Sequence, residues 1–590
     1  MRRSAALLLS LLAAASCRDG SAGPRNWPDT WLYPYDAVPV VAPRGMVVTT
    51  DRYASEVGVE VLRSGGNAVD AAVAVALALA VVNPEAGNLG GGGFMVVHMA
   101  DGTAATLDFR EKAPAAATPD MFLDSLGNVT EKSLVGHLAA GVPGTVRGLW
   151  DAHARFGTRP WEELVQPAVG LARGFAVTER FTLSLGGGVV EELSRFPASA
   201  AVFLPGGRPP SVGDTLRQPD LAATLTRIGQ AGADGFYLGE TADLIVREME
   251  RGGGLITHED LRAYTAAWRE PVRFEYRGHT VLSMPPSSSG GVTLAESAGI
   301  LETFQLGELE WHDGEHVHLL AEAWRRAFAD RNHYLADPDF VPTPRELLAS
   351  PAYAAWRAAD ISPERATPSL QVRPGLEAYS PGAWPPASAP SPRVEGGNTT
   401  HFSVVDSLGN AVSLTTTINS WYGSKVVVEG AGFLLNNEMD DFSAKPGEPN
   451  QFGLVQGEAN AIEPGKRMLS AMTPVIVLDP QGRLFMVAGS PGGPTIITTV
   501  FQVLSNVVDH GMNLAQAVLA PRVHHQHLPD RIEYEEGGLP EEVVEELREL
   551  GHAVREERDT SGDVQAILVA PDGTLHGQSD PRLGGVAVGY

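Results

Sequence analysis

Residues Asn398, Thr399 and Thr400 place two hydroxyl side chains behind an asparagine and before an alternating, strand-like run. A threonine hydroxyl is a weak nucleophile unless a base lies beside it. The α-amino group of the same residue can act as that base once the chain is cut before it, because this amine titrates near about pH 8. Cleavage before a threonine would therefore create a catalytic group. Two simpler interpretations are the start of a β-strand and, because "NTT" fits N-x-T, a glycosylation site.

The elements around this junction are predicted from composition and periodicity. Residues 362–397 are rich in Pro, Ser and Ala and have few periodic apolar positions, which is typical of a mobile or extended connector. Behind the threonines, residues 401–417 alternate through a hairpin that turns at 408–410, and further strands are predicted at 474–478 and 484–488. The junction therefore lies between a connector and a β-sheet.

The sequence pattern of the first half of the chain predicts helices packed on strands. Residues 46–66 indicate a short strand and then a helix that ends at glycine, and residues 68–82 indicate a second helix, too short to span a bilayer. Strands starting at 94 and 104 are joined by an Asp-Gly turn. From 142 to 348 the pattern is mainly helical, apart from strand-like residues near 272–284.

The N-terminus has the layout of an export signal, with two arginines before a short apolar run, so residues 1–16 are predicted to be a signal peptide. Cys17, the single cysteine, follows small residues and resembles a bacterial lipoprotein cleavage site; lipidation there and simple cleavage both remain open. Residues 17–43 are predicted to form an N-terminal arm. The expected location is the periplasm or, through a lipid anchor, the membrane surface.

Composition excludes one class of partner. The 590 residues carry a formal net charge of −27, with 43% hydrophobic and 19% charged residues, as in a globular protein. Nucleic-acid binding depends on clustered Lys and Arg, and the sequence has no such cluster, so we expect no nucleic-acid partner.

Several long motifs, in order, resemble the γ-glutamyltranspeptidase family over nearly the whole chain after the leader. They are "LRSGGNAVDAAVA", "GNLGGGGFM", "LDFREKAP", "NTTHFSVVD", "TTTINSWYGSK", "LLNNEMDDFSAKPG", "MLSAMTPVI", "GSPGGP" and "PRVHHQHLPD". The resemblance implies an α+β fold, the four-layer αββα sandwich of the N-terminal-nucleophile hydrolases. It also implies a precursor that cuts itself between Asn398 and Thr399. The expected products are a large subunit, 44–398, and a small catalytic subunit, 399–590, which form a heterodimer.

The same resemblance assigns roles to residues of this sequence. Thr399 would cleave the precursor and then carry a γ-glutamyl ester, which is released to water or to an amino acid or peptide acceptor. The implied helpers are Thr417, which hydrogen-bonds the nucleophile, the oxyanion-hole pair Gly492 and Gly493, and the lid residue Phe452. The implied donor site consists of Arg110 and Ser470 for the α-carboxylate, and of Asp441, Asn419 and Glu438 for the α-ammonium. The expected substrates are glutathione and related γ-glutamyl compounds.

One departure concerns donor recognition. The family usually has two adjacent serines where this chain has Ser470 and Ala471, and the loss of one hydroxyl is expected to weaken carboxylate binding by about 1 to 3 kcal/mol. A cephalosporin or glutaryl-amide acylase of the same fold is therefore an alternative. An uncleaved protein that binds γ-glutamyl ligands without turnover is another. No cofactor is expected, and the histidine runs "HVH" and "RVHHQH" are not expected to bind metal.

Overall fold

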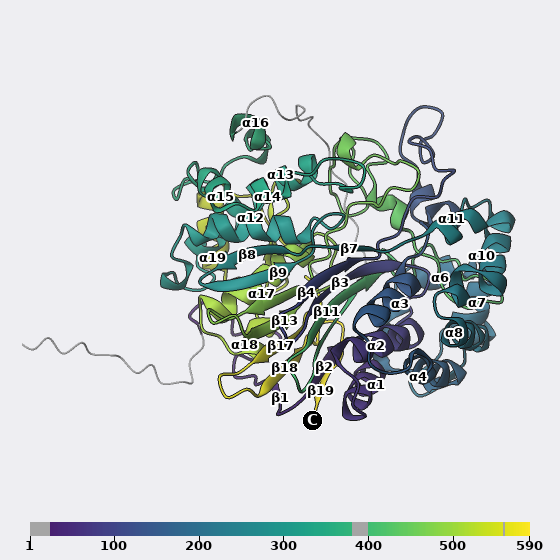
Figure 1. The fold of residues 1–590 in the computed structure, drawn as a ribbon. Coiled ribbons are helices and arrows are strands. Elements are labelled where there is room, and N and C mark those ends of the chain that lie inside the picture. Colours follow the sequence, from purple (N-terminus) through teal and green to yellow (C-terminus); the bar gives the residue numbers. More distant parts are fainter. Residues whose placement is uncertain (1–23, 380–398, 558–560) are drawn as a thin grey trace, which may run out of the picture.

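The computed structural model describes residues 24–379, 399–557 and 561–590. At its centre two seven-stranded antiparallel sheets are stacked, and helices cover the outer face of each (Figure 1). The first sheet contains, in spatial order, β1 (Val40–Ala42), β18 (Leu575–Ser579), β17 (Gln565–Val569), β13 (Leu484–Ala488), β12 (Val475–Leu478), β9 (His279–Ser283) and β8 (Val272–Tyr276). The second contains β19 (Val586–Gly589), β2 (Met46–Thr49), β10 (Thr399–Val405), β11 (Ala411–Thr417), β3 (Gly92–His98), β4 (Ala104–Asp108) and β7 (Ala267–Arg269).

The helices form two outer layers. On the side of the second sheet lie α1 (Arg52–Arg63), α2 (Ala68–Val82), α3 (Thr145–Phe156), α4 (Trp161–Arg173), α8 (Pro219–Ala231) and α10 (Gly239–Gly252). On the side of the first lie α12 (Gly290–Glu302), α13 (Gly314–Tyr334), α15 (Pro351–Ala358), α17 (Thr495–Val508), α18 (Leu514–Leu519) and α19 (Glu541–Glu549). The predicted αββα layering is confirmed.

Short elements complete the described chain. The helices are α5 (Glu179–Ser184), α6 (Val189–Ser194), α7 (Pro197–Phe203), α9 (Asp234–Tyr237), α11 (His258–Ala263), α14 (Arg345–Leu348) and α16 (Leu376–Tyr379). The strands are β5 (Phe175–Ala176), which pairs with β6 (Thr215–Leu216), and a small sheet of β14 (Val523–His524), β15 (Ile532–Glu535) and β16 (Val554–Glu557).

Two helices near the N-terminus start at strong caps. Asp51 caps α1 by accepting a hydrogen bond from the Tyr53 N–H at 2.8 Å. Asn67 and Asp70 form a capping box on α2, which is buried along its whole length and has the predicted bounds. Within the described ranges, no helix has both the length and the apolar character needed to cross a membrane.

The predicted hairpin behind the candidate nucleophile is confirmed. Strands β10 and β11 pair antiparallel, with Thr399 opposite Thr417, and lie inside the second sheet because β2 pairs with β10 and β3 with β11. Along β10 every residue is buried. The chain therefore enters the core at Thr399.

Two predicted linkers contact the protein body where the structure describes them. The N-terminal arm contributes β1, the edge strand of the first sheet. Residues 362–379 pack on the protein body: Thr367 donates two hydrogen bonds to Glu322, the Ser369 N–H donates to Asp530, and Leu376 is fully buried. These contacts anchor residues 362–379, and the mobility predicted for the connector stays a prediction. Residues 1–16, Cys17, 380–397 and Asn398 lie outside the described residues.

Candidate active site

A small cavity of about 30 Å³ lies where β10 begins. The predicted site residues that line it are Arg110, Thr399, Thr417, Asn419, Glu438, Asp441, Phe452, Ser470 and Gly493. These residues come from both sides of the proposed cleavage point and from loops at the ends of both sheets. Folding thus brings together almost all of the predicted site.

The two threonines after Asn398 have different surroundings. The Thr399 hydroxyl donates a hydrogen bond to Thr417 Oγ1 at 3.3 Å, and Thr417 Oγ1 also accepts from the Asn419 N–H at 2.8 Å. Thr400 Oγ1 instead lies 2.9 Å from Thr50 Oγ1 and is fully buried. Because adjacent strand residues point to opposite faces of a sheet, only Thr399 faces the cavity.

Asn419 follows β11 in an uncommon conformation. Its φ of 76° lies in the left-handed region, which non-glycine residues rarely adopt. Its Nδ2 donates to the Asn437 carbonyl at 3.1 Å, next to the short turn Glu438–Asp441. This bond holds the end of β11 against the turn that carries Glu438 and Asp441.

Arg110 is the centre of a buried charge cluster. Its Nη1 lies 2.7 Å from Glu438 Oε2 and 3.6 Å from Glu111 Oε2, and its Nη2 donates to Asp441 Oδ2. The Arg110 carbonyl accepts from Tyr264 Oη at 2.8 Å, which fixes the backbone below the guanidinium. A guanidinium beside several carboxyl groups can contact both ends of an amino-acid zwitterion.

Burial shifts the protonation of this cluster. Burial raises the pKa of Glu111 to about 8 and that of Glu438 well above its usual range, although Arg110 opposes both shifts. Burial also raises the pKa of Asp441, against the pull of Arg110. The carboxyl groups in turn raise the pKa of Arg110, although burial opposes this. Burial therefore favours the protonated form of these carboxyl groups, and Arg110 favours the ionised form.

Ser470 and Ala471 form another part of the cavity wall. The Ser470 carbonyl accepts from the Ser289 N–H at 2.8 Å and from Ser289 Oγ at 2.6 Å, and its own hydroxyl accepts from the Met472 N–H at 3.1 Å. Ala471 also lines the cavity and is 9% exposed, so no hydroxyl is present at that point of the wall.

Gly492 and Gly493 precede helix α17. Their φ angles of 130° and 58° favour glycine, and among the described residues neither N–H group has a hydrogen-bond acceptor. A Cβ at Gly493 would lie 2.8 Å from the Phe452 ring, so that ring packs directly over the glycine. Gly493 lines the cavity, and Gly492 lies immediately before it. Free N–H groups at a helix N-terminus suit a developing oxyanion.

Sequence reasoning missed two charged residues of this site, Glu111 and Arg331. Glu111 directly follows Arg110, and Arg331 lies on α13 and lines the cavity. A signal for Arg331 was available, because α13 is buried along nearly its whole length and still carries four charged residues in 325–331. Charged side chains in a buried helix need partners or ligands.

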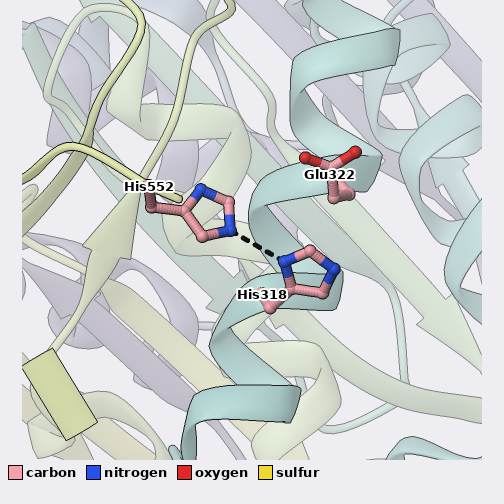
Figure 2. Close-up of side chains that lie close together, drawn as sticks. All are labelled: His318, Glu322 and His552. Carbon is pink, nitrogen blue, oxygen red and sulfur yellow. Dashed lines mark hydrogen bonds between the residues drawn. The ribbon is translucent and has the colours of Figure 1, made fainter. Parts of the chain in front are cut away.

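The histidine run in α13 belongs to another cluster, outside this cavity. His318 Nδ1 lies 2.7 Å from His552 Nε2, and Glu322 lies one turn further along the helix (Figure 2). The two rings are inclined at 65° to each other. These three residues have the types of a metal site. The Glu322 oxygens, however, accept hydrogen bonds from three residues, Arg325, Arg326 and Thr367. Its lone pairs are therefore occupied, and we assign the cluster to anchoring residues 362–369.

Stacked antiparallel sheets between helical layers, with a threonine at the start of an inner strand facing a charged pocket, define an N-terminal-nucleophile hydrolase. The chain belongs to the gamma-glutamyltranspeptidase family, whose sequence model matches residues 54–590. It is similar to the glutathione hydrolase proenzyme of Escherichia coli strain K12, with 46% identity over 578 residues and 97% of each chain covered.

Two solved structures illustrate the range of the fold. The γ-glutamyltranspeptidase of Helicobacter pylori is 44% identical with a TM-score of 0.56, and the match covers 57% of this chain and 96% of that one. A cephalosporin acylase from Bacillus halodurans is 26% identical with a TM-score of 0.79, covering 95% and 99%. The fold is therefore shared by γ-glutamyl enzymes and acylases.

Proposed function

We propose that the protein is an exported, self-processing γ-glutamyl acyltransferase and hydrolase that acts on glutathione and related γ-glutamyl compounds. One observation carries this proposal: Thr399 lines the same cavity as Arg110, Glu438 and Asp441. A nucleophile is thus placed within one small substrate's length of groups that match an amino-acid zwitterion. The similarity to glutathione hydrolase proenzymes supports the substrate class.

In maturation, Thr399 Oγ attacks the carbonyl carbon of Asn398 and the peptide nitrogen leaves as the new α-amino group. Water then hydrolyses the resulting ester. The large subunit ends at Asn398 and the small subunit begins at Thr399, and the two remain together as a heterodimer. The freed amine is the base that the nucleophile needs for turnover.

In turnover, the Thr399 amine takes the proton of its own hydroxyl, and Oγ attacks the γ-carbonyl of the donor. The N–H groups of Gly492 and Gly493 stabilise the oxyanion, and Thr417 orients the hydroxyl. The intermediate collapses to a γ-glutamyl ester on Thr399 as the leaving amine takes the proton. Water or the amine of an amino acid or peptide acceptor then releases the γ-glutamyl group.

Donor recognition follows from the charges of the cavity. Arg110 and Ser470 bind the α-carboxylate, whereas Asp441, Asn419 and Glu438 bind the α-ammonium. In this structure Arg110 contacts Asp441 and Glu438 directly, so the zwitterion inserts between these ion pairs as it binds. Phe452 covers the bound donor as a lid, because its ring packs over Gly493 beside the cavity.

A denaturing gel with N-terminal sequencing tests the processing step. Wild-type protein is expected to give two bands, the smaller beginning at Thr399. Thr399→Ala is expected to stay whole, and Thr400→Ser, a matched control, is expected to be cleaved. A single full-length band from active wild-type protein would refute self-processing and favour the uncleaved binder. The N-terminus of the larger fragment reports export, and a blocked Cys17 reports lipidation.

An acylase that prefers donors without the α-ammonium is the second candidate, favoured by Ala471 and by the fold shared with the cephalosporin acylase. Turnover of γ-glutamyl p-nitroanilide and of glutaryl p-nitroanilide separates the two functions. We expect preference for the γ-glutamyl compound, because Asp441 and Glu438 have no partner in a glutaryl donor. Preference for the glutaryl compound would establish the acylase instead.

A further inference from the structure

Arg331 is a buried cation on the wall of the active-site cavity. It lies near the end of α13 and is 1% exposed. Its Nε donates to Ser289 Oγ at 2.9 Å and its Nη1 to Asn332 Oδ1 at 2.8 Å. Within the described part of the chain, no carboxylate forms an ion pair with it, and Nη2 donates no hydrogen bond.

An unpaired guanidinium in this position is unusual. Burying a charge without a counterion is costly, so buried arginines are normally paired. Arg325 and Arg326 of the same helix follow that rule, since both pair with Glu322. Burial lowers the pKa of Arg331 to about 10, and Asp441 offsets this only in part. A ligand anion would supply the missing partner.

The neighbours of Arg331 indicate which anion. Ser289 Oγ accepts from Arg331 Nε and donates to the Ser470 carbonyl at 2.6 Å, so the guanidinium is connected to the wall formed by Ser470 and Ala471. Both of these wall residues line the cavity with Arg331. Ala471 provides no hydroxyl there. The positive charge therefore lies on the side of the cavity where one carboxylate-binding group is missing.

The other cation of the cavity is already paired. Arg110 contacts Glu438, Asp441 and Glu111, whereas the hydrogen bonds of Arg331 within the described residues go to neutral oxygens. An incoming carboxylate must compete for Arg110 with these three groups. At Arg331 it meets no carboxylate in direct contact.

We propose that Arg331, together with Ser470, binds the α-carboxylate of the γ-glutamyl donor and thereby selects donors that carry this group. This inference rests on the proposed γ-glutamyl function and adds a specificity-determining residue to it. The free Nη2 forms the charge-assisted hydrogen bond, and the bonds to Ser289 and Asn332 hold the guanidinium plane in place.

Three p-nitroanilides test the assignment: γ-glutamyl, glutaryl, which lacks the α-ammonium, and 4-aminobutyryl, which lacks the α-carboxylate. In Arg331→Gln we expect kcat/KM to fall about 10- to 100-fold for the first two donors and to change little for the third. Arg331→Lys keeps the charge and is expected to lose less. Inhibition by L-glutamate, which has the α-carboxylate, and by 4-aminobutyrate, which lacks it, gives the same comparison. This measurement does not depend on turnover of the 4-aminobutyryl anilide.

The controls separate specificity from folding. Self-cleavage on a gel and the thermal midpoint report whether each variant folds. Asn332→Ala removes a side chain that contacts Arg331 and leaves the charge of Arg331 in place. Equal losses on all three donors, or no loss on any, would overturn the role of Arg331. Wild-type protein that fails to hydrolyse the γ-glutamyl anilide would instead refute the proposed function.

Discussion

The hydroxyl of Thr399 donates to the hydroxyl oxygen of Thr417, 3.3 Å away, across an antiparallel strand pair in which these residues lie opposite each other. Thr417 Oγ1 is itself fixed by the N–H of Asn419 at 2.8 Å. The orientation of the candidate nucleophile is therefore set by a strand register and not by a mobile loop.

Replacing Thr417 with valine removes this oxygen while preserving the shape of the side chain. We expect kcat for the γ-glutamyl anilide to fall about 100-fold, because a misoriented nucleophile loses near-attack geometry. Thr417→Ser keeps the oxygen and is expected to retain most of the activity. If the serine variant loses as much as the valine variant, the methyl group matters and the hydrogen bond does not.

Ala471→Ser restores a hydroxyl on the carboxylate side of the cavity. We expect kcat/KM for the γ-glutamyl anilide to rise roughly 2- to 10-fold, the effect of one added hydrogen bond. Steady-state kinetics with the 4-aminobutyryl anilide provide the comparison, since that donor has no carboxylate to bind. A similar gain on both donors would argue against a contact with the carboxylate.

Gly493→Ala introduces a methyl group 2.8 Å from the Phe452 ring and displaces an N–H group of the proposed oxyanion hole. We expect kcat to fall by about 100-fold or more. Gly482 is a control, because its φ of 79° is also in the left-handed region but no atom of a non-adjacent described residue lies within 4 Å of its Cβ position. Gly482→Ala is expected to lower the thermal midpoint and leave kcat unchanged; a comparable loss of kcat in both variants would make strain the cause.

The cap Asp51 gives a prediction about pH. Burial raises its pKa from 3.8 to about 6, so the folded chain binds more protons than the unfolded chain between these values. Stability therefore falls as pH rises through this window, and the loss is complete above about pH 6. Asp51→Asn keeps the cap without the charge, and we expect it to gain of order 2 kcal/mol at pH 8 and nothing at pH 3.

Thermal or urea unfolding of Thr399→Ala precursors, with and without Asp51→Asn, measures this difference on a single chain. Asp51→Ala is the control, because it removes the cap and is expected to be the least stable variant at pH 3. An equal gain from asparagine at both pH values would show that the charge of Asp51 has no part in the effect.

Local sequence signals were sufficient to predict those helices and strands whose ends are marked in the sequence itself. Helix α2 was predicted with its correct ends because its apolar run is bracketed by Gly65, Gly66 and Pro84; the Asn67 cap was found only in the structure. The hairpin of β10 and β11 was predicted because its alternation is interrupted at a Gly-Asn turn. The contacts of residues 362–379 could not be predicted, because they are hydrogen bonds to residues far away in the sequence, such as Glu322 and Asp530, which composition does not reveal.

The site itself was predictable only through the family motifs. Arg110 and Asp441 lie 331 positions apart in sequence, and no periodicity relates them. Arg331 belongs to no motif that suggested a site, and its significance depends on the absence of a carboxylate partner among the described residues, which is a property of packing. The structure was therefore needed to show which distant residues lie together in the site and which charged side chains have no oppositely charged partner among the described residues.

The order of strands in the second sheet determines what happens after the chain is cut. Strands β10 and β11, from the proposed small subunit, lie between β2 and β3 of the proposed large one, and β19 closes the other side of β2. Two polypeptides whose strands alternate in one sheet cannot separate while each stays folded, because separation would break the hydrogen bonds between their strands. The mature heterodimer should therefore melt in one cooperative transition, and fragments expressed apart should become soluble and active only when they fold together.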